Sequence, residues 1–370
     1  MWTSNLKKIL SDLIGELRRP IVLERSPETA VPLQDGVRDE TFDVLKGIAI
    51  ILMIVGHCEI GPLRPFIFSF HMPLFFFVAG YFLKVRSLRD EFRLSVRRLI
   101  LPYAFTALCI CIIAVCEDLL NYSWSDGSYT QGTIIHFLLG FRGDSPPEWL
   151  FGHVGMLWFI LAMFWARFLA VLFIGKIKSQ RILCSVFFFF GLLGIVLERN
   201  YFIPYCIPQG FSAAGFIYVG YLVKKLNLLD SANNIKRVLP FLVILWLYCW
   251  SQGVLGLYIC RFPAGYVFSV LGALGAFFVL FIVVKNTFYK ENFFWKCIQY
   301  CGRCSLVIYC VHAIEFETCN WKAFALLHHI PLAHFTFFQI SVHLTIAIVF
   351  TLIILKIRPL REGIFQISKI

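Results

Sequence analysis

Apolar residues form long blocks along this chain, and the charged residues fall in short runs between the blocks. A helix rises about 1.5 Å per residue, so roughly 17–25 apolar residues are needed to cross a bilayer core about 30 Å thick. The pattern predicts an all-α integral membrane protein, a bundle of about ten transmembrane helices. Some blocks are short or contain glycine and proline, so nine and eleven helices are open alternatives. The predicted helices are 42–60, 65–83, 99–120, 153–175, 182–198, 208–223, 238–257, 263–284, 300–319 and 335–356.

The cations between the blocks predict how the bundle is oriented. With a cytoplasmic N-terminus, the inner connections contain clusters of basic residues: Lys84, Arg86, Arg89, Arg93, Arg97 and Arg98, then Lys176, Lys178 and Arg181, then Lys224, Lys225, Lys236 and Arg237, then Lys285, Lys290, Lys296 and Arg303. Each outer connection contains one cation: Arg64, Arg142, Arg199, Arg261 and Lys322. This asymmetry follows the positive-inside rule and predicts that the N- and C-termini are both cytoplasmic.

One membrane domain is predicted to fill residues 41–358, because no repeat and no charge-rich or Gly/Ser-rich linker divides them. Residues 1–40 form a cytoplasmic segment without the features of a secretory signal peptide. An amphipathic surface helix and a flexible tail are both open for this segment. Residues 359–370 are predicted to be a cytoplasmic tail, and the long outer connection 121–152, rich in Trp and Pro, is expected to lie at the interface over an outward opening.

Composition agrees with a membrane protein and narrows the list of partners. Hydrophobic residues make up 59% of the chain and charged residues 15%, whereas a soluble domain is about 45–50% apolar. The net charge of +12 could indicate nucleic-acid binding, but the cations are placed as topology signals, so no nucleic-acid partner is expected. Most of the 13 cysteines lie inside apolar blocks, where cysteine behaves as a small hydrophobic residue.

Two histidines inside apolar blocks are the main candidates for chemistry. His57 lies near the outer end of the first predicted helix and His71 lies about five residues into the second, so both should reach a similar depth in the outer half of the bundle. Lys46 precedes His57 by eleven positions, about three helical turns, and Asp43 lies near the same inner end. Hydrogen bonding that only fastens the helices is the alternative role. The pattern favours a buried base served by a polar channel.

A neutral imidazole can take a proton from a hydroxyl and return it to a leaving group, as acyl transfer to an alcohol requires. No Gly-x-Ser-x-Gly elbow occurs in the sequence. These residues favour direct transfer, and a covalent enzyme intermediate is the open alternative.

A run of arginines follows the second predicted helix. Arg89, Arg93 and Arg97 share one helical face, and Arg98 follows directly. Arginine binds phosphate well, so an anion site for a cytosolic donor is one interpretation. An ordinary basic cytoplasmic loop is the other.

No metal site is predicted. No paired Cys-x-x-Cys set accompanies Cys297, Cys301 and Cys304, and the histidines at 328, 329 and 334 lie in an outer loop. The sequence also lacks a phosphate-binding glycine loop and a dinucleotide fingerprint.

Over almost its whole length the sequence resembles the membrane-bound acyltransferase 3 family. The resemblance is strongest at Asp43-x-x-Lys46-Gly47 followed by His57, and at Phe70-His71-Met72-Pro73-Leu74-Phe75-Phe76 with Gly80-Tyr81-Phe82. Weaker matches are Arg97-Arg98-Leu99-Ile100-Leu101-Pro102-Tyr103, Leu157-Trp158-Phe159-Ile160, Gly220-Tyr221 and Tyr300-x-Gly302-x-x-Ser305-Leu306-x-Ile308-Tyr309-x-x-His312. Many members have Arg where this chain has Lys46. In having Lys at this position, the chain resembles the fucose 4-O-acetylase-like branch.

The resemblance implies an O-acetyltransferase of the bacterial cytoplasmic (inner) membrane. Its donor would be cytosolic acetyl-CoA, and its acceptor a hydroxyl of a cell-surface polysaccharide, a lipid-linked glycan or a related sugar. His57 would be the base, Asp43 and Lys46 would organise the donor side, and His71 would position the acyl group or acceptor. Arg93, Arg97 and Arg98 would hold the CoA phosphates, while Trp158, Tyr309 and His312 are weaker candidates for lining the cavity.

Other functions are compatible with the same residues. A transporter or proton-coupled carrier would also bury His and Lys residues along its pathway. A membrane scaffold that has lost catalytic activity is a further alternative. The presence of both histidines, Lys46 and the arginines argues against it. The lipid bilayer is the one partner that composition requires, and a homo-oligomer is possible.

Overall fold

The computed structural model describes residues 40–120, 128–140, 155–229, 232–288, 292–329 and 332–367. The described residues form helices and connecting loops, with one isolated antiparallel bridge between Gly256 and Arg261. The all-α class that the sequence predicts is confirmed for this part of the chain. The predictions for residues 1–39, and for Trp124 and Trp149 in the long outer connection, fall outside the described residues.

The described residues contain α-helices, π-helices and short 3₁₀ turns. The α-helices are α2 (Glu40–Gly56), α3 (Leu63–Phe68), α4 (His71–Tyr81), α5 (Leu88–Ser95), α6 (Leu101–Leu120), α7 (Ser128–Leu139), α8 (Trp158–Lys176), α9 (Gln180–Asn200), α10 (Ile207–Lys225), α11 (Ala232–Ser251), α12 (Tyr266–Thr287), α13 (Phe293–Arg303), α14 (Ser305–Thr318), α15 (Trp321–Leu327) and α16 (Leu332–Lys356). The π-helices η1 (Val96–Ile100) and η5 (Pro359–Ile364) and the 3₁₀ turns η3 (Gly155–Leu157) and η4 (Leu257–Ile259) complete the set.

Six helical segments among the described residues are long and apolar enough to cross a membrane, and the bent pair α13–α14 would make a seventh. The six are Leu63–Tyr81, Leu88–Leu119, Gly155–Lys176, Gln180–Asn200, Tyr266–Thr287 and His334–Lys356. Three further predicted spans correspond to α2, α10 and α11, of which α2 has only 17 residues. The chain is therefore a helical membrane protein, while the count of ten stays a prediction.

Two predicted helices are broken in the structure. The segment expected at 65–83 consists of α3 and α4, separated at Ser69 and Phe70. Pro73 therefore lies in the first turn of α4, where a missing N–H breaks no intrahelical bond, instead of kinking a continuous helix. The segment expected at 300–319 is divided at Cys304 between α13 and α14, whose axes differ by 74°. Apolar blocks record which residues are buried, but not a break of one or two residues inside a block.

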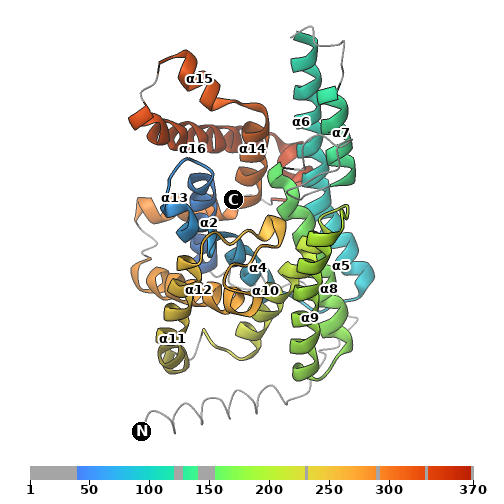
Figure 1. Ribbon diagram of the computed structural model, residues 1–370, viewed down its shortest axis with the longest axis vertical. Helices are drawn as coiled ribbons and strands as arrows, with labels where there is room; N and C mark the ends of the chain where they lie inside the picture. Colours follow the sequence, from blue (N-terminus) through green and yellow to red (C-terminus); the bar gives the residue numbers. More distant parts are fainter. Residues whose placement is uncertain are drawn as a thin grey trace.

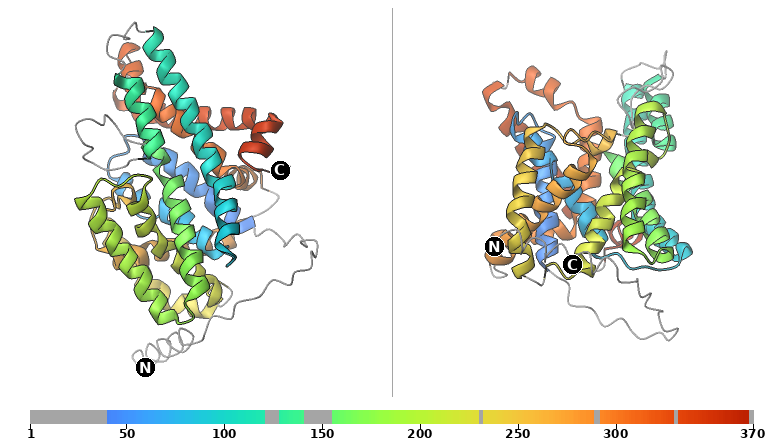
Figure 2. Two further views of the ribbon diagram at one scale, coloured as in Figure 1. Left: turned by 90° about the vertical axis from the view of Figure 1, so that its right-hand side faces the viewer. Right: turned by 60° about the horizontal axis from the view of Figure 1, so that its bottom comes forward.

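The first two helical segments lie at the centre of the molecule. In Figure 1, α2 and α4 are enclosed by later helices, with α6, α7, α8 and α9 along one side. The side view in Figure 2 shows the same four helices as a wall. Helix α2 packs against α4, α12, α13, α14 and α16, and α4 packs against α8, α10 and α12. Residues near the ends of α2 and α4 are thus surrounded by the rest of the fold.

Glycines allow two pairs of helices to approach until their backbones touch. A Cβ atom on Gly47 of α2 would lie 2.0 Å from the carbonyl oxygen of Ile298 on α13. In the same way, a Cβ on Gly80 of α4 would lie 2.0 Å from the carbonyl oxygen of Ile217 on α10. Small residues at helix contacts are a common means of close packing in membranes. These two contacts fix α2 and α4 within the bundle.

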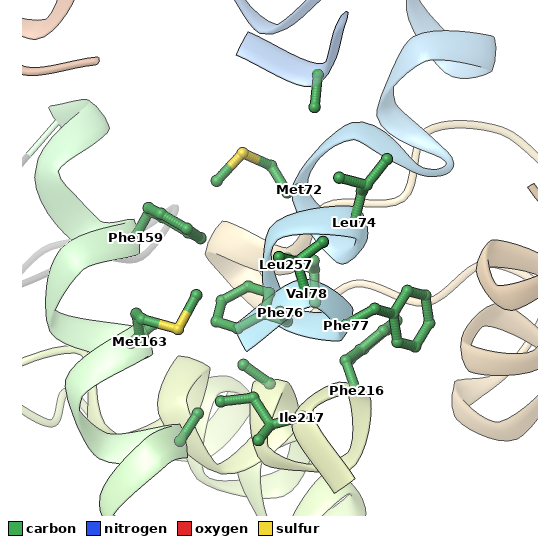
Figure 3. Packing of buried hydrophobic residues seen from close by; sticks show 14 of the residues in the cluster. Met72, Leu74, Phe76, Phe77, Val78, Phe159, Met163, Phe216, Ile217 and Leu257 are labelled. Carbon is green, nitrogen blue, oxygen red and sulfur yellow. The ribbon is translucent and has the colours of Figure 1, made fainter. Parts of the chain in front are cut away.

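Aromatic side chains pack between α4 and its neighbours α8 and α10. Figure 3 shows Phe76 and Phe77 of α4 between Phe159 of α8 and Phe216 of α10. The ring centroids are 5.1 Å apart for Phe76 and Phe159 and 5.6 Å apart for Phe77 and Phe216. Because aromatic rings bury large areas in few orientations, this packing gives α4 a defined rotation about its axis.

Candidate active site

His57 follows the last residue of α2 and is only partly buried. Its Nδ1 atom lies 2.7 Å from the carbonyl oxygen of Met53, one turn earlier. A carbonyl oxygen can only accept, so Nδ1 carries the proton and the other ring nitrogen, Nε2, is an acceptor in the neutral ring. The helix end therefore presents His57 in the tautomer that a general base needs.

His71 is the first residue of α4 and is 1% exposed. Its Nδ1 atom lies 2.8 Å from the carbonyl oxygen of Ile67 on α3, which fixes the same tautomer as in His57. His71 and His57 line one cavity of about 200 Å³. The structure therefore brings together the two histidines that the sequence singles out.

The wall of this cavity, here called the outer cavity, combines aromatic and charged groups. Trp158, Tyr258 and Tyr309 contribute aromatic rings, while Arg64 and Glu317 contribute opposite charges. Glu317 accepts a hydrogen bond of 3.2 Å from the backbone N–H of Met156. The hydroxyl of Tyr309 donates to the carbonyl oxygen of Met156. Glu317 and Tyr309 of α14 therefore bind both the N–H and the carbonyl group of Met156, which lies in η3.

A second cavity of about 230 Å³, the inner cavity, adjoins the outer one. The two share Met53, Met72 and Tyr309 in their walls. Apart from these, the inner cavity is mostly apolar, with two cations, Arg98 and Arg167, in its wall. The cavities thus extend in series from a pair of arginines to a pair of histidines.

The arginine run does not act as one cluster in the structure. Arg98 lines the inner cavity, whereas Arg93 and Arg97 line a separate groove with Arg86 and Asp90. Arg97 and Arg98 both lie in the π-helix η1, which covers Val96–Ile100. Arg93 and Arg97 are four positions apart and line the same groove, as helical spacing predicts. Adjacent residues of a helix point in different directions, so Arg98 lines the inner cavity instead.

Arg167 on α8 is a site residue that the sequence analysis missed. Its side chain forms contacts of 2.8 and 2.9 Å with the carboxylate of Glu91, which is fully buried. Arg86 lies 3.4 Å from the same carboxylate, and Ser95 donates to it. A lone cation inside the apolar block 153–175 was the signal that could have revealed it, because such residues are usually functional.

Asp43 and Lys46 line neither cavity. The Lys46 ammonium lies 2.9 Å from Asp43, and the guanidinium of Arg303 on α13 lies 3.5 Å from the other oxygen of that carboxylate. Together with the Gly47 contact, these ion pairs hold α13 against α2. Helical spacing predicts that Lys46 and His57 share one face of α2. The inner end of that face takes part in the contact between α2 and α13.

Behind His57 lies a buried group that the sequence analysis also missed. Glu315 of α14 is within hydrogen-bond distance of His312 at 3.0 Å and of His343 on α16 at 2.7 Å. His312 does not line the outer cavity, although Trp158 and Tyr309 do. The signal in the sequence was a glutamate and a histidine within two apolar blocks, 300–319 and 335–356.

These same three side chains are the set of potential metal ligands that the described residues bring within 4.8 Å of one another. Their N···O distances are those of N–H donors around a carboxylate. Neither the cysteines near residue 300 nor the outer-loop histidines gather into such a set in the described part of the chain. The absence of a functional metal stays a prediction.

The sequence profile of the acyltransferase 3 family, described as an acyltransferase domain, matches residues 39–355. The chain therefore belongs to this family. Nodulation protein NolL of Sinorhizobium fredii is 28% identical over 230 residues, which cover 59% of this chain and 56% of that protein. Nodulation protein NolL of Mesorhizobium japonicum is 26% identical over 164 residues, covering 40% and 38% of the two chains. The chain thus spans about half the length of these curated relatives or less, and no solved structure matches it.

Proposed function

We propose that this protein is an O-acetyltransferase that moves an acetyl group from cytosolic acetyl-CoA to a hydroxyl of a cell-surface polysaccharide, a lipid-linked glycan or a related sugar. The observation that carries the proposal is the pair of adjoining cavities, one with two arginines in its wall and the other with both histidines in its wall. Membership of the acyltransferase 3 family supports the class of reaction.

The donor would occupy the inner cavity. Arg98 and Arg167 would bind CoA phosphates, because charge-assisted hydrogen bonds from arginine are strong and matched to phosphate. The apolar wall suits the pantetheine arm and brings the thioester to the junction at Met53 and Met72. Arg93 and Arg97 lie in the other groove, so we assign phosphate binding to the two arginines of the inner cavity.

The acceptor would occupy the outer cavity. Trp158, Tyr258 and Tyr309 offer aromatic surfaces to a sugar ring, and Arg64 and Glu317 offer polar partners to its hydroxyl groups. Nε2 of His57 would remove the proton of the attacking hydroxyl, and His71 would orient the acetyl group or the acceptor. Asp43 and Lys46 would act by fixing α2 against α13.

We further propose that the bundle lies in a bacterial cytoplasmic membrane with both termini in the cytoplasm and about ten crossings. The basic clusters in the inner connections support this orientation. It places the arginines on the side where acetyl-CoA is made and the histidines towards the outer face. A reporter fused after residue 370 should be active only in the cytoplasm, and activity outside it would contradict this orientation.

The function is tested with membranes that contain the protein, isotope-labelled acetyl-CoA and the glycans of the producing cell. The wild type should transfer label into glycan esters, and His57→Ala should reduce transfer at least about 10²-fold because the general base is lost. His328→Ala is the matched control, since His328 is exposed and lines neither cavity. Substrate flux without consumption of acetyl-CoA would instead indicate a carrier, and full activity of His57→Ala at normal protein levels would exclude His57 as the base.

A further inference from the structure

The buried carboxylate of Glu315 is surrounded by N–H donors from three helices. Nδ1 of His312 on α14 lies 3.0 Å away, Nδ1 of His343 on α16 lies 2.7 Å away, and the indole N–H of Trp321 on α15 also donates to it. Glu315 is 4% exposed. A carboxylate is tolerated at such burial when donors of this kind replace water.

These contacts determine the tautomer of His312. The carboxylate accepts hydrogen bonds, so Nδ1 of His312 holds a proton and Nε2 is an acceptor in the neutral ring. His312 is 0% exposed, and its Nε2 atom has no hydrogen-bond partner. An unsatisfied buried acceptor costs about 1–3 kcal/mol. A purely structural role, in which His312 only fastens the helices together, would use Nδ1 alone. Such a role does not explain why Nε2 is buried without a partner.

His312 lies directly behind the proposed base. The centroids of the His312 and His57 rings are 5.8 Å apart, with an angle of 67° between the ring planes. Phe316 packs against both rings, at 5.4 Å from His57 and 5.9 Å from His312. His57 and Phe316 line the outer cavity, whereas His312 and Glu315 do not. The order from the cavity inward is therefore His57, His312 and Glu315.

We propose that Glu315 is a positioning residue for acetyl transfer, a role that rests on the proposed function. Glu315 holds His312 in one tautomer and one orientation. It also places a negative charge behind His57, with the ring of His312 between the two. It acts on the reaction through the charge of His57 and touches neither substrate.

The charge matters at one point in the reaction. The acceptor oxygen forms a bond to the thioester carbonyl carbon while its proton passes to Nε2 of His57, which becomes a cation. The C–S bond then breaks with its electron pair on sulfur, and His57 returns the proton to that thiolate, leaving an ester and the thiol of CoA. Glu315 and His312 stabilise the transient cation, because a fixed charge in a low-dielectric site acts more strongly than in water.

The test replaces Glu315 with Gln, which keeps the size of the side chain and removes its charge. The apparent kcat should fall about 10²-fold, the size of a typical general acid–base contribution. The KM for acetyl-CoA should stay within about twofold of the wild type, because the inner cavity is unchanged. Glu315→Asp should have an intermediate kcat. Glu362→Gln is the matched control, since this carboxylate pairs with Arg358 and Arg361 outside both cavities.

His312→Asn is a second variant that keeps an N–H donor for Glu315 and removes the ring behind His57. It should lower kcat by a similar factor, with acetyl-CoA affinity and thermal stability in detergent close to those of the wild type. Wild-type kcat in both variants would overturn the proposal. Loss of donor affinity and stability in parallel with kcat in both variants would show a structural role and overturn it as well.

Three further outcomes distinguish failure of this inference from failure of the proposed function. A metal ion that copurifies with the wild type in stoichiometric amount and is lost in Glu315→Gln would overturn the positioning role. An inactive His57→Ala with a fully active Glu315→Gln would overturn only this inference. A wild-type protein that transfers no acetyl group under any condition would overturn the proposed function and this inference together.

Discussion

At the scale of single residues, the structure separates neighbours that the sequence groups together. Arg97 and Arg98 are adjacent, yet only Arg98 lines the inner cavity, with Arg167 from a helix about 70 positions later. Both histidines of the outer cavity were identifiable from the sequence, because a titratable group inside an apolar block is rare. Arg167, Glu315 and His343 had the same signal, but they lie in three different blocks, and nothing in the sequence shows which of these blocks meet His57.

The adjacent arginines offer a direct test of the inner cavity. Arg98→Ala should raise the KM for acetyl-CoA about 10-fold, because one charge-assisted hydrogen bond to phosphate is worth about 1.5–3 kcal/mol. Arg97→Ala should change this KM less than about twofold, since its side chain faces the other groove. Both values come from initial rates at varied acetyl-CoA. A larger effect of Arg97→Ala than of Arg98→Ala would contradict the assignment.

At the scale of elements, close backbone contacts decide where the site residues stand. The Asp43-x-x-Lys46-Gly47 motif combines two ion pairs with a contact in which α2 touches α13. Gly302 on α13 makes the reciprocal contact, since a Cβ there would lie 1.7 Å from the carbonyl oxygen of Asp43. The motif therefore sets the position of α2, and with it the position of His57 at the opposite end.

A methyl group at this contact should loosen the bundle. Gly47→Ala should lower the free energy of unfolding by about 1–3 kcal/mol, the usual cost of overpacking, because the added Cβ meets backbone that cannot rotate away. The measurement is thermal unfolding in detergent micelles, together with acetyl transfer. Gly363→Ala is the control, since nothing lies within 4 Å of a Cβ at that position. Equal unfolding temperatures for the two variants would show that α13 moves aside without cost.

At the scale of the whole molecule, the two cavities adjoin each other inside the bundle. Helices α2, α4 and α14 each contribute a residue to both cavities, namely Met53, Met72 and Tyr309. Figure 1 shows α2 and α4 in the interior of the molecule, surrounded by later helices. Under the proposed function, the donor and the acceptor would meet at this junction.

Filling the junction should stop transfer without preventing donor binding. Met72→Trp is expected to lower the apparent kcat at least about 10-fold, because a larger ring would occupy the space through which the thioester reaches His57. Met72→Leu, of similar volume, should retain most activity. Acetyl-CoA affinity, measured separately by equilibrium binding, should change less than about threefold in both variants. Normal turnover of Met72→Trp would place the reaction elsewhere.

The sequence by itself determined the helical membrane class, the family and the two histidines of the outer cavity. It could do so because bilayer solvation selects long apolar blocks, and because a polar group inside such a block stands out in the sequence. Tertiary structure alone decided that α3 and α4 are separate, that the arginines divide between two grooves, and that Glu315 lies behind His57. The physical reason is that a break in a helix or a contact between distant helices depends on packing over a few ångströms, which the length of an apolar block and the spacing of residues along the chain do not record.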